Sequence, residues 1–256
     1  MAIVEDGAKL GADVTIDAFS YIHAGAVIGD GSWIGPQAVI YGSTILGEEC
    51  RVHAGVILGD TPQDLGFSGG KTYVHIGDRC TFREGVTIHR GTKEGSITHV
   101  GNDCFFMANS HVAHNCVLGN NVILTNSALL GGHVEVGDGA FISANCLVHQ
   151  FVRIGRLAML GGNSGANKDV PPFCMIHPYG LNRLSGLNTV GLRRAQMTAP
   201  ERKELKEAYR ILFMSTTLQK EALTRIRKIM NSPAVLELCS FVEDSKRGVC
   251  IPHKKP

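Results

Sequence analysis

The sequence predicts an all-β solenoid followed by an α-helical tail, and two patterns carry that prediction. An aliphatic residue or a phenylalanine recurs at every sixth position from Val4 to Leu160, interrupted only at Asp64, Gly70 and Glu94. A small side chain stands two positions before most of these residues, and glycine often stands one position after them. Neither a helix nor a simple strand produces this period, whereas a fixed short repeat is typical of a solenoid.

Each six-residue unit is interpreted as one short strand and one corner. Residues i and i+2 of a strand face the same side, so the small and the aliphatic residue both point inward. The glycine is expected where the chain turns tightly. Three units, about 18 residues, would close a triangular coil, and stacked coils would pair through parallel hydrogen bonds. The pattern resembles the hexapeptide-repeat family, which implies a left-handed parallel β-helix over residues 1–172.

The interruptions of the repeat predict two loops that leave the solenoid. The first lies near residues 60–73, and the second, near residues 90–99, takes the place of the unit at Glu94. Long loops on a regular scaffold often carry function, so both loops are candidates for part of a binding site.

The chain beyond residue 172 predicts a different structure. Residues 173–196 are interpreted as a linking segment, and residues 197–256 as a C-terminal helical domain. A threonine N-cap, an early proline and helical periodicity predict a helix over residues 198–214. Residues 217–230 and 233–245 also fit helices.

Charge divides near the same boundary. Residues 193–256 carry 14 Lys and Arg against 7 Asp and Glu, whereas the rest of the chain carries 11 against 16. A basic tail predicts either an acidic partner or simply solvated helix faces. The tail has no basic strip interleaved with aromatic residues and no known nucleic-acid motif, so nucleic acid is not the expected partner.

The cysteines are predicted to be core residues, with no disulfides and no metal. Without a CxxC spacing, they read as small apolar side chains, and a core rich in thiols fits a reducing cytoplasm. The repeat begins within residues 1–20, so no signal peptide is expected, and no apolar run reaches membrane length. Five of the eight cysteines occupy the small inward slot: Cys50, Cys80, Cys104, Cys116 and Cys146.

The coil length stacks a group of histidines near one corner, beside the loop at residues 90–99. Three imidazoles can hold Zn²⁺ with an open position, and one imidazole can act as a general base near neutral pH. Both a metal site and a catalytic base therefore stay open. The group consists of His111, His114, His133 and His149. Solvated or hydrogen-bonded positions are expected instead for His23, His53, His75, His89 and His99.

Several motifs stand outside the plain repeat. They are Thr87–Thr92 (TIHRGT), Asn109–His114 (NSHVAH), Gly132–His133, His149–Phe151, Asp169–Pro172 and Gly186–Arg194 (GLNTVGLRR). Together they resemble the UDP-N-acetylglucosamine acyltransferase family, over essentially the whole chain. The resemblance implies transfer of an (R)-3-hydroxyacyl chain from acyl carrier protein to the 3-hydroxyl of UDP-N-acetylglucosamine, the first step of lipid A biosynthesis. It also implies a cytoplasmic homotrimer that uses no metal and no cofactor.

The same resemblance implies roles for individual residues. His114 matches the general base, the backbone N–H of Gly132 matches the oxyanion donor, and Asn115 would orient the base. Met159 and Gly162 match the acyl groove, where a glycine implies room for a longer chain. The acidic acyl carrier protein would be the partner of the basic tail. Substrate contacts are implied for Gln63, Asp64, His111, His133, His149, Gln150, Asn188, Arg193 and Arg194.

Three positions depart from the family pattern. Asn115 stands where aspartate is common, and asparagine can orient an imidazole but supplies no charge. Gly66 replaces a lysine, and Val190 replaces an acidic residue found in some members.

Three other functions remain as alternatives. The same base could acylate a 3-amino sugar nucleotide and give an amide. A metal lyase of the γ-carbonic-anhydrase type would need a wider histidine spacing than that of His111 and His114. A non-catalytic hexapeptide subunit would leave the histidine corner without a purpose.

Overall fold

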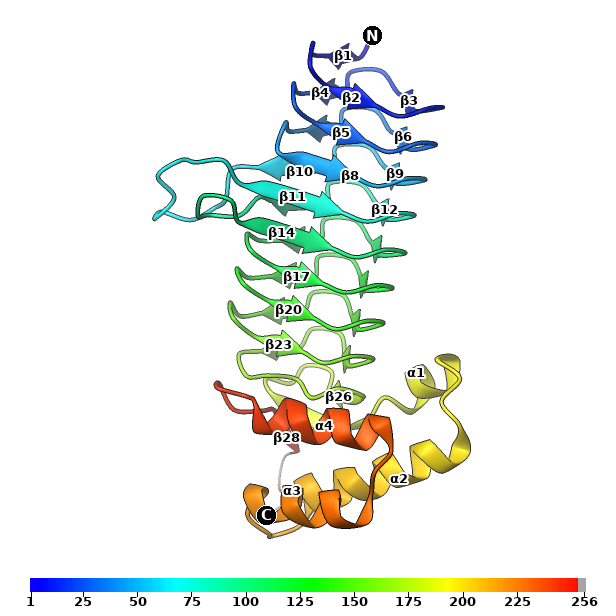
Figure 1. Cartoon of the computed structure of the whole chain (residues 1–256), viewed down its shortest axis with the longest axis vertical. Helices are drawn as coiled ribbons and strands as arrows, with labels where there is room; N and C mark the ends of the chain where they lie inside the picture. Colours follow the sequence, from blue (N-terminus) through cyan, green and yellow to red (C-terminus); the bar gives the residue numbers. More distant parts are fainter. Residues whose placement is uncertain (253–256) are drawn as a thin grey trace.

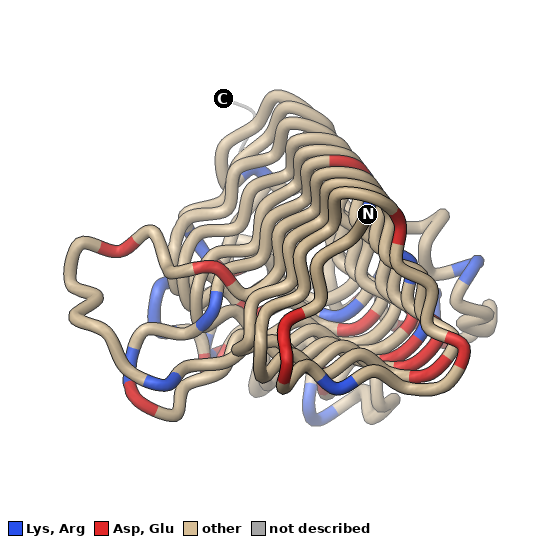
Figure 2. The backbone as a smooth tube through the Cα atoms, turned by 90° about the horizontal axis from the view of Figure 1, so that it is seen from above, with Lys and Arg blue, Asp and Glu red and all other residues tan. Residues whose placement is uncertain are grey.

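The computed structural model describes residues 1–252, which form an elongated prism capped at one end by helices (Figure 1). Seen along its length, the prism has a triangular outline, and long loops project from one corner (Figure 2). The parallel β-helix and the helical region after it confirm the predicted fold class in outline. Residues 253–256, which the predicted helical domain included, lie outside the described residues. No helix within residues 1–252 is long and apolar enough to cross a bilayer.

Three sheets form the faces of the prism, and each coil contributes one strand to each sheet. The first sheet contains β1 (Ile3–Val4), β4 (Tyr21–Ile22), β7 (Val39–Ile40), β10 (Ile57–Asp60), β13 (Thr87–His89), β16 (His111–Val112), β19 (Leu129–Leu130), β22 (Leu147–Val148) and β25 (Gly165–Ala166). The second contains β2 (Lys9–Leu10), β5 (Val27–Ile28), β8 (Thr44–Leu46), β11 (Tyr73–Ile76), β14 (Ile97–Val100), β17 (Val117–Leu118), β20 (Glu135–Val136) and β23 (Arg153–Ile154). The third contains β3 (Thr15–Ile16), β6 (Trp33–Ile34), β9 (Arg51–Val52), β12 (Thr81–Phe82), β15 (Phe105–Phe106), β18 (Ile123–Leu124), β21 (Phe141–Ile142), β24 (Met159–Leu160), β26 (Cys174–Ile176), β27 (Arg183–Leu187) and β28 (Ile251–Pro252).

Strand pairing keeps the six-residue repeat in register along the prism. In the regular part His111 pairs with Leu129, and Leu129 pairs with Leu147, so neighbouring strands differ by one coil of sequence. Across the first loop Ile57 pairs with Thr87. The inserted residues therefore leave the prism as loops and do not disturb the stacking.

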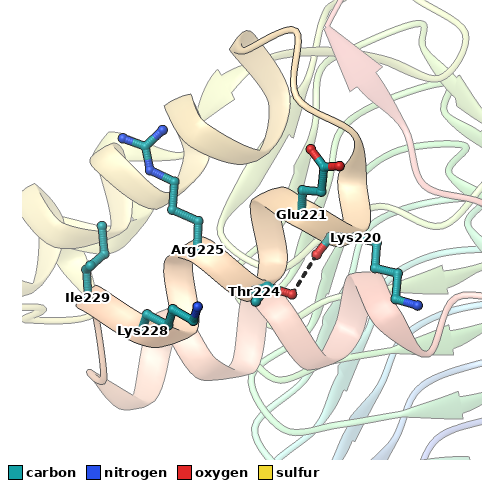
Figure 3. A pocket seen from close by; sticks show the side chains of 6 residues that line it. All are labelled: Lys220, Glu221, Thr224, Arg225, Lys228 and Ile229. Atoms are coloured by element: carbon teal, nitrogen blue, oxygen red, sulfur yellow. Dashed lines mark hydrogen bonds between the residues drawn. The ribbon is translucent and has the colours of Figure 1, made fainter.

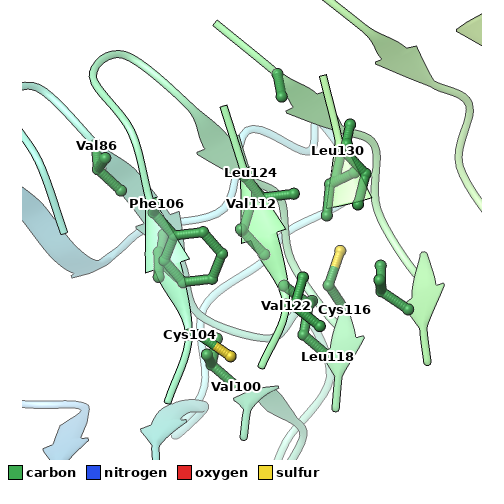
Figure 4. Close-up of a cluster of buried hydrophobic side chains, with 14 of the residues drawn as sticks. Val86, Val100, Cys104, Phe106, Val112, Cys116, Leu118, Val122, Leu124 and Leu130 are labelled. Atoms are coloured by element: carbon green, nitrogen blue, oxygen red, sulfur yellow. The ribbon is translucent and has the colours of Figure 1, made fainter. Parts of the chain in front are cut away.

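The inward side chains form one continuous core (Figure 4). Val112, Leu118 and Leu124 are fully buried. The cysteines are free and buried, which confirms the prediction for the five that occupy the small slot. At the N-terminal end, Val4 and Leu10 are 42% and 43% exposed, because no further coil covers the first one.

The prediction for the glycine slot is wrong in its physical reason. A positive φ occurs in most corners, three positions before the next aliphatic residue, and there the side chains are often not glycine. Asn109, Asn115 and His133 have φ values of 60°, 61° and 60°. Asparagine tolerates this region better than most residues, which explains its frequency here.

The glycine after the aliphatic residue is instead required by the close approach of the next coil. A Cβ on Gly137 would lie 2.6 Å from the backbone nitrogen of Arg156, and a Cβ on Gly155 would lie 2.3 Å from that of Pro172. Only a residue without a side chain fits between backbones this close.

The two loops connect β10 to β11 and β13 to β14, and they support each other. The backbone N–H of Lys71 donates to Glu94 Oε2 at 2.9 Å, and the N–H of Gly95 donates to the Lys71 carbonyl at 2.8 Å. Both loops leave the corner between the first and the second sheet, as Figure 1 shows on one side of the prism.

Parallel pairing extends beyond residue 172, where a linking segment had been predicted. β26 pairs with β24 in the third sheet, and β27 then turns back to pair antiparallel with β26. The short helix α1 (Thr189–Arg194) follows directly. This segment therefore completes the end of the prism before the helices begin.

The helical region contains α2 (Ala199–Tyr209), a π-helical turn η1 (Arg210–Met214), α3 (Gln219–Ile229) and α4 (Pro233–Glu243). The predicted start of the first long helix is confirmed, because Thr198 and Glu201 cap α2 reciprocally. Two contacts join α4 to the prism beside the second sheet. Glu237 of α4 forms an ion pair of 2.7 Å with Arg156, and the guanidinium of Arg153 lies 4.4 Å from the centre of the Phe241 ring.

Candidate active site

A shallow pocket lies at the corner between the first and the second sheet, below the two loops. Because the coils stack in register, residues far apart in the sequence meet along this corner. The pocket is lined by Gln63, His111, Ala113, His114, Leu129, Leu130, Gly131, Gly132, Leu147, Val148, His149 and Gln150. Six of the residues that the sequence singled out for chemistry or substrate contact therefore line this pocket.

The proton on His114 can be assigned from its neighbours. The Asn115 side-chain oxygen accepts from the backbone N–H of Thr92 at 3.1 Å and from the Thr92 hydroxyl at 2.9 Å. A backbone N–H can only donate, so the atom facing it is the amide oxygen and not the nitrogen. His114 Nδ1 lies 2.9 Å from the same oxygen and must therefore donate to it.

In the neutral imidazole this arrangement turns the lone pair of His114 Nε2 toward the pocket. The Asn115 backbone is fixed in turn, because its N–H donates to Thr98 Oγ1 at 2.8 Å. Loop residue Thr92 and strand residue Thr98 thus hold the orienting asparagine from two sides. Thr92 belongs to the motif Thr87–Thr92, but nothing in the sequence singled out Thr98, which looks like an ordinary strand residue.

Asp64 reaches the same nitrogen from the first loop. Its Oδ2 lies 3.8 Å from His114 Nε2, and its Oδ1 accepts from the backbone N–H of Gly66 at 2.8 Å. The tight turn thus holds one oxygen of the carboxylate and leaves the other facing the imidazole. At 3.8 Å the two groups leave space for a hydroxyl group to approach both.

Gly132 lies directly against the His114 ring. A Cβ at this position would lie 2.4 Å from Cε1 and 2.6 Å from Nε2 of the imidazole, so no other residue fits. At the same position of the repeat, but at the corner between the second and the third sheet, the backbone N–H groups of Asn102 and Asn120 each donate to a side chain of the next coil at 2.8 Å. Among residues 1–252 the N–H of Gly132 has no such acceptor, and it remains available to a ligand.

His111 is a neutral neighbour of His114. Burial, followed by the nearby His89 and His114, lowers the pKa of His111 to about 4. Its Nδ1 lies 2.7 Å from Thr87 Oγ1, and its ring meets the edge of His89 at 4.9 Å between centroids. Burial also lowers the pKa of His89, which the sequence had placed among the solvated or hydrogen-bonded histidines. Its Nδ1 is buried without a hydrogen-bond partner among the described residues.

His133 lies on the other side of His114. The two rings meet edge to face at 5.3 Å, and His133 stacks on Phe151 at 4.5 Å. Burial and the charges of His114 and Lys93 lower the pKa of His133. Two histidines of lowered pKa thus flank His114, and neither adds a positive charge beside it at neutral pH.

Known proteins match this chain over nearly its whole length. A family model described as UDP-N-acetylglucosamine O-acyltransferase, domain 2, matches residues 169–250, and hexapeptide repeats match residues 25–60 and 97–132. The acyl-[acyl-carrier-protein]–UDP-N-acetylglucosamine O-acyltransferase of Campylobacter concisus is 38% identical over 252 residues, which are 97% of this chain and 95% of that protein. The chain belongs to this acyltransferase family.

Other relatives agree. The enzyme of the same name from Rhizobium rhizogenes is 40% identical and covers 99% of this chain and 94% of its own length. The solved structure of the UDP-N-acetylglucosamine acyltransferase from Campylobacter jejuni has a TM-score of 0.93 and 38% identity, with 98% of each chain covered. The corresponding structure from Bacteroides fragilis has a TM-score of 0.93 and 36% identity, with 97% of each chain covered.

In this acyltransferase a second group of predicted residues lies on another face of the prism. Met159, Asn188 and Arg194 line an apolar pocket on the third sheet, whereas His114 lies at the opposite corner, between the first and the second sheet. The other lining residues are Ile123, Gly139, Phe141, Leu157, Met175, Leu187, Thr189, Val190, Gly191 and Ala195. One copy of the acyltransferase therefore does not bring the two groups together.

Asn188 already has a structural role at this second pocket. Its Oδ1 accepts from the Gly191 N–H at 3.0 Å and caps α1, while its Nδ2 donates to the Leu157 carbonyl at 2.9 Å. Arg193 is exposed on α1 and does not line the pocket. Gly162 is open, because the nearest atom to an added Cβ would be the Ala144 carbonyl oxygen at 3.8 Å.

Residues 1–252 contain no group of three or more His, Cys, Asp or Glu side chains arranged to hold a metal ion. The nitrogen Nδ1 of both His111 and His114 is engaged with a neighbouring oxygen, as described above. The polar groups of the acyltransferase pocket are thus arranged around the His114 Nε2 atom.

Proposed function

We propose that the protein transfers an (R)-3-hydroxyacyl chain from acyl carrier protein to the 3-hydroxyl of UDP-N-acetylglucosamine, as the first step of lipid A biosynthesis. The observation that carries the proposal is the fixed tautomer of His114, whose Nε2 lone pair faces the pocket. A sugar hydroxyl is a weak nucleophile, and a base at hydrogen-bond distance removes its proton as it attacks.

The reaction needs no covalent intermediate on the protein. The sugar 3-oxygen attacks the thioester carbonyl carbon while its proton moves to His114 Nε2. The carbonyl oxygen becomes an oxyanion, and the free N–H of Gly132 is the donor that would stabilise it. When the carbon–sulfur bond breaks, the imidazolium returns the proton to the carrier's thiolate, and the ester product and free thiol remain.

Asn115 would orient the imidazole of His114 and Asp64 would supply the negative charge, two roles that a single aspartate could fill. The Asn115 oxygen holds the imidazole in the right tautomer but adds no charge. The Asp64 carboxylate, 3.8 Å from Nε2, is placed to accept a hydrogen bond from a sugar hydroxyl and to stabilise the imidazolium. Gln63, His111, His133, His149 and Gln150 would contact the rest of the sugar nucleotide.

A homotrimer would explain why the predicted site residues lie on two faces. His114 of one copy and the third-sheet pocket with Met159, Asn188 and Arg194 of a neighbouring copy would together form a cleft. The arginines, including Arg193, would bind the diphosphate, since a guanidinium pairs well with phosphate oxygens. The left-handed coil and the cytoplasmic location that the resemblance implies belong to the same proposal.

The acyl chain would lie along the apolar surface, and the carrier protein would dock on the helices. Gly162 has space beside it, which fits a groove for a longer chain, and Met159 lines the apolar pocket. On α3, three exposed cations, Lys220, Arg225 and Lys228, lie around a shallow depression (Figure 3). An acidic carrier protein suits such a surface.

The direct test is transfer with a panel of donors and acceptors. Purified protein is given (R)-3-hydroxyacyl carrier proteins of several chain lengths, with UDP-N-acetylglucosamine or its 3-amino analogue. We expect ester formation with UDP-N-acetylglucosamine and the highest kcat/KM for one of the longer chains. Preference for the amino analogue would assign an amide-forming reaction, and no transfer with any pair would refute the proposal.

A further inference from the structure

One arginine from the C-terminal end of the chain reaches the catalytic pocket. Arg247 Nη2 lies 3.3 Å from Nδ1 of His149, a residue 98 positions earlier. Its Nε donates to the Asn167 carbonyl at 3.2 Å. The guanidinium is thus attached at two points to the corner that carries the pocket.

The segment around Arg247 is held firmly against the prism by one buried carboxylate. Asp169 is 1% exposed, and its Oδ2 accepts from the Ser245 hydroxyl at 2.8 Å. Its backbone N–H donates to the Gly248 carbonyl at 3.0 Å, and its carbonyl accepts from the Cys250 N–H at 2.8 Å. Three bonds on either side of Arg247 therefore fix the backbone from which it extends.

No carboxylate neutralises this arginine. None of the ion pairs among residues 1–252 includes Arg247 or Lys168. Asp169, which follows Lys168 in the sequence, uses Oδ1 for the Arg153 N–H and Oδ2 for Ser245. The side chains of Arg247 and Lys168 therefore have N–H donors available to bind the anion of a ligand.

Lys168 belongs to the same corner by register. Val148 pairs with Ala166, so Lys168 lies one coil beyond Gln150, in the column that begins with His114 and Gly132. Its chain neighbour Asn167 is the residue that accepts from Arg247. His149 lies two coils from the coil of His111, about 10 Å along the prism, and the cations continue beyond it.

His149 strengthens the same site in either tautomer. Nδ1 lies 3.0 Å from the Gln150 carbonyl and 3.3 Å from Arg247, and it can serve only one of them. If Nδ1 donates to the carbonyl, the guanidinium keeps a free N–H. If Nδ1 accepts from the guanidinium, the proton is on Nε2. One donor beside the pocket thus remains available in both cases.

We propose that Arg247 and Lys168, beside His149, form a phosphate-binding subsite at the edge of the catalytic pocket. The inference rests on the proposed function, because both substrates of that reaction carry phosphate. One source is the diphosphate of the sugar nucleotide, and the other is the phosphate of the phosphopantetheine arm of the carrier protein. A guanidinium and an ammonium without a carboxylate fit a phosphate dianion from either source.

The test compares R247Q and K168Q with K246Q, which removes the same charge from the adjacent exposed position and serves as the control. KM is measured separately for UDP-N-acetylglucosamine and for the acyl carrier protein. Loss of a charge-assisted hydrogen bond to phosphate predicts a rise of about 10-fold or more in one KM for R247Q and a smaller rise for K168Q. K246Q should stay within about twofold of the wild type.

Two further probes identify the source of the phosphate. Weaker calorimetric binding of UDP to R247Q assigns the subsite to the nucleotide. If instead 4′-phosphopantetheine loses its advantage over pantetheine as an inhibitor in R247Q, the subsite belongs to the carrier arm. The variant R247K, which keeps the charge without the planar fork, should be intermediate. Unchanged values of both KM and of both probes in a folded R247Q would overturn the proposal.

These outcomes separate the subsite from the proposed function. If the wild-type protein shows no transfer, the proposed function fails. The subsite can still be tested by calorimetry, which compares the binding of UDP, and of 4′-phosphopantetheine against pantetheine, to the wild type and to R247Q. If transfer is normal and R247Q behaves like K246Q, the subsite fails alone.

Discussion

At the scale of single residues, the chemistry depends on how neutral polar groups fix one imidazole. Asn115 replaces the aspartate that the family pattern would favour, and the structure shows what the amide can still do. It accepts from a backbone N–H and from His114 with the same oxygen, so the tautomer is set without a charge. The amide carries no negative charge to stabilise the imidazolium. In the proposed mechanism the Asp64 carboxylate, from a different loop, supplies that charge.

Replacing Asn115 separates orientation from charge. N115A loses the acceptor for His114 Nδ1, and we expect kcat to fall about 100-fold, the range typical of a misplaced base. N115D keeps an acceptor and adds a charge that stabilises the imidazolium, so its kcat should stay near wild type while the acidic limb of the pH–rate profile moves to higher pH. Equal kcat values and identical profiles for N115A and wild type would show that Asn115 does not orient the base.

His111 should make stability depend on pH. Its folded pKa of about 4 lies below the ordinary value of 6.5, so the unfolded chain binds more protons between these two values. The unfolding free energy should therefore decrease as pH falls from 6.5 to 4, by roughly 3 kcal/mol from this residue. Urea unfolding of H111N should lose that part of the slope, whereas H99N, at an exposed histidine, should keep it.

At the scale of elements, the six-residue unit explains the positions of the candidate site residues that lie on the coils, such as His111, His114 and His149. The repeat predicted which residues face inward, and it predicted the loops from its own interruptions. It misassigned the glycine slot, because sequence spacing alone does not distinguish a residue that needs a positive φ from one that needs space. That distinction depends on the neighbouring coil, as the 2.6 Å approach at Gly137 shows.

Two alanine substitutions compare a glycine that lies close to the next coil, Gly137, with a glycine that has open space beside it, Gly162. G137A places a Cβ against the Arg156 backbone, and we expect the unfolding free energy to fall by about 1–3 kcal/mol, as in other overpacked sites. G162A meets nothing closer than 3.8 Å and should change the free energy by less than about 0.5 kcal/mol. Chemical denaturation measures both. Equal destabilisation would mean that the coils tolerate the added methyl group by shifting.

At the scale of the whole molecule, the contacts that could not be predicted are those between distant parts of the chain. The register brought His111, His114 and His149 to one pocket because coil length is a property of the repeat. Nothing in the spacing indicated that Arg247 would reach His149, or that α1 would place Arg194 on the third sheet. Both depend on how the helical region folds back onto the prism.

In the proposed homotrimer, the separation of His114 from Arg194 predicts complementation between inactive subunits. H114A and R194A homotrimers should each show little transfer. Mixed trimers, formed by coexpression with different affinity tags, should recover activity, because some clefts then contain an intact His114 facing an intact Arg194. Light scattering should give a trimer for all three samples. Mixed trimers as inactive as the parents would place both residues in the site of one subunit.

The central claim is that His114 is the base, and the most direct measurement is transfer by H114A. Initial rates are compared under saturating (R)-3-hydroxyacyl carrier protein and UDP-N-acetylglucosamine, with H99A as the histidine control and circular dichroism as the check of folding. We expect H114A to lose at least about 1,000-fold in kcat while remaining folded, and H99A to stay near the wild-type rate. A folded H114A within a few fold of wild type would contradict the account.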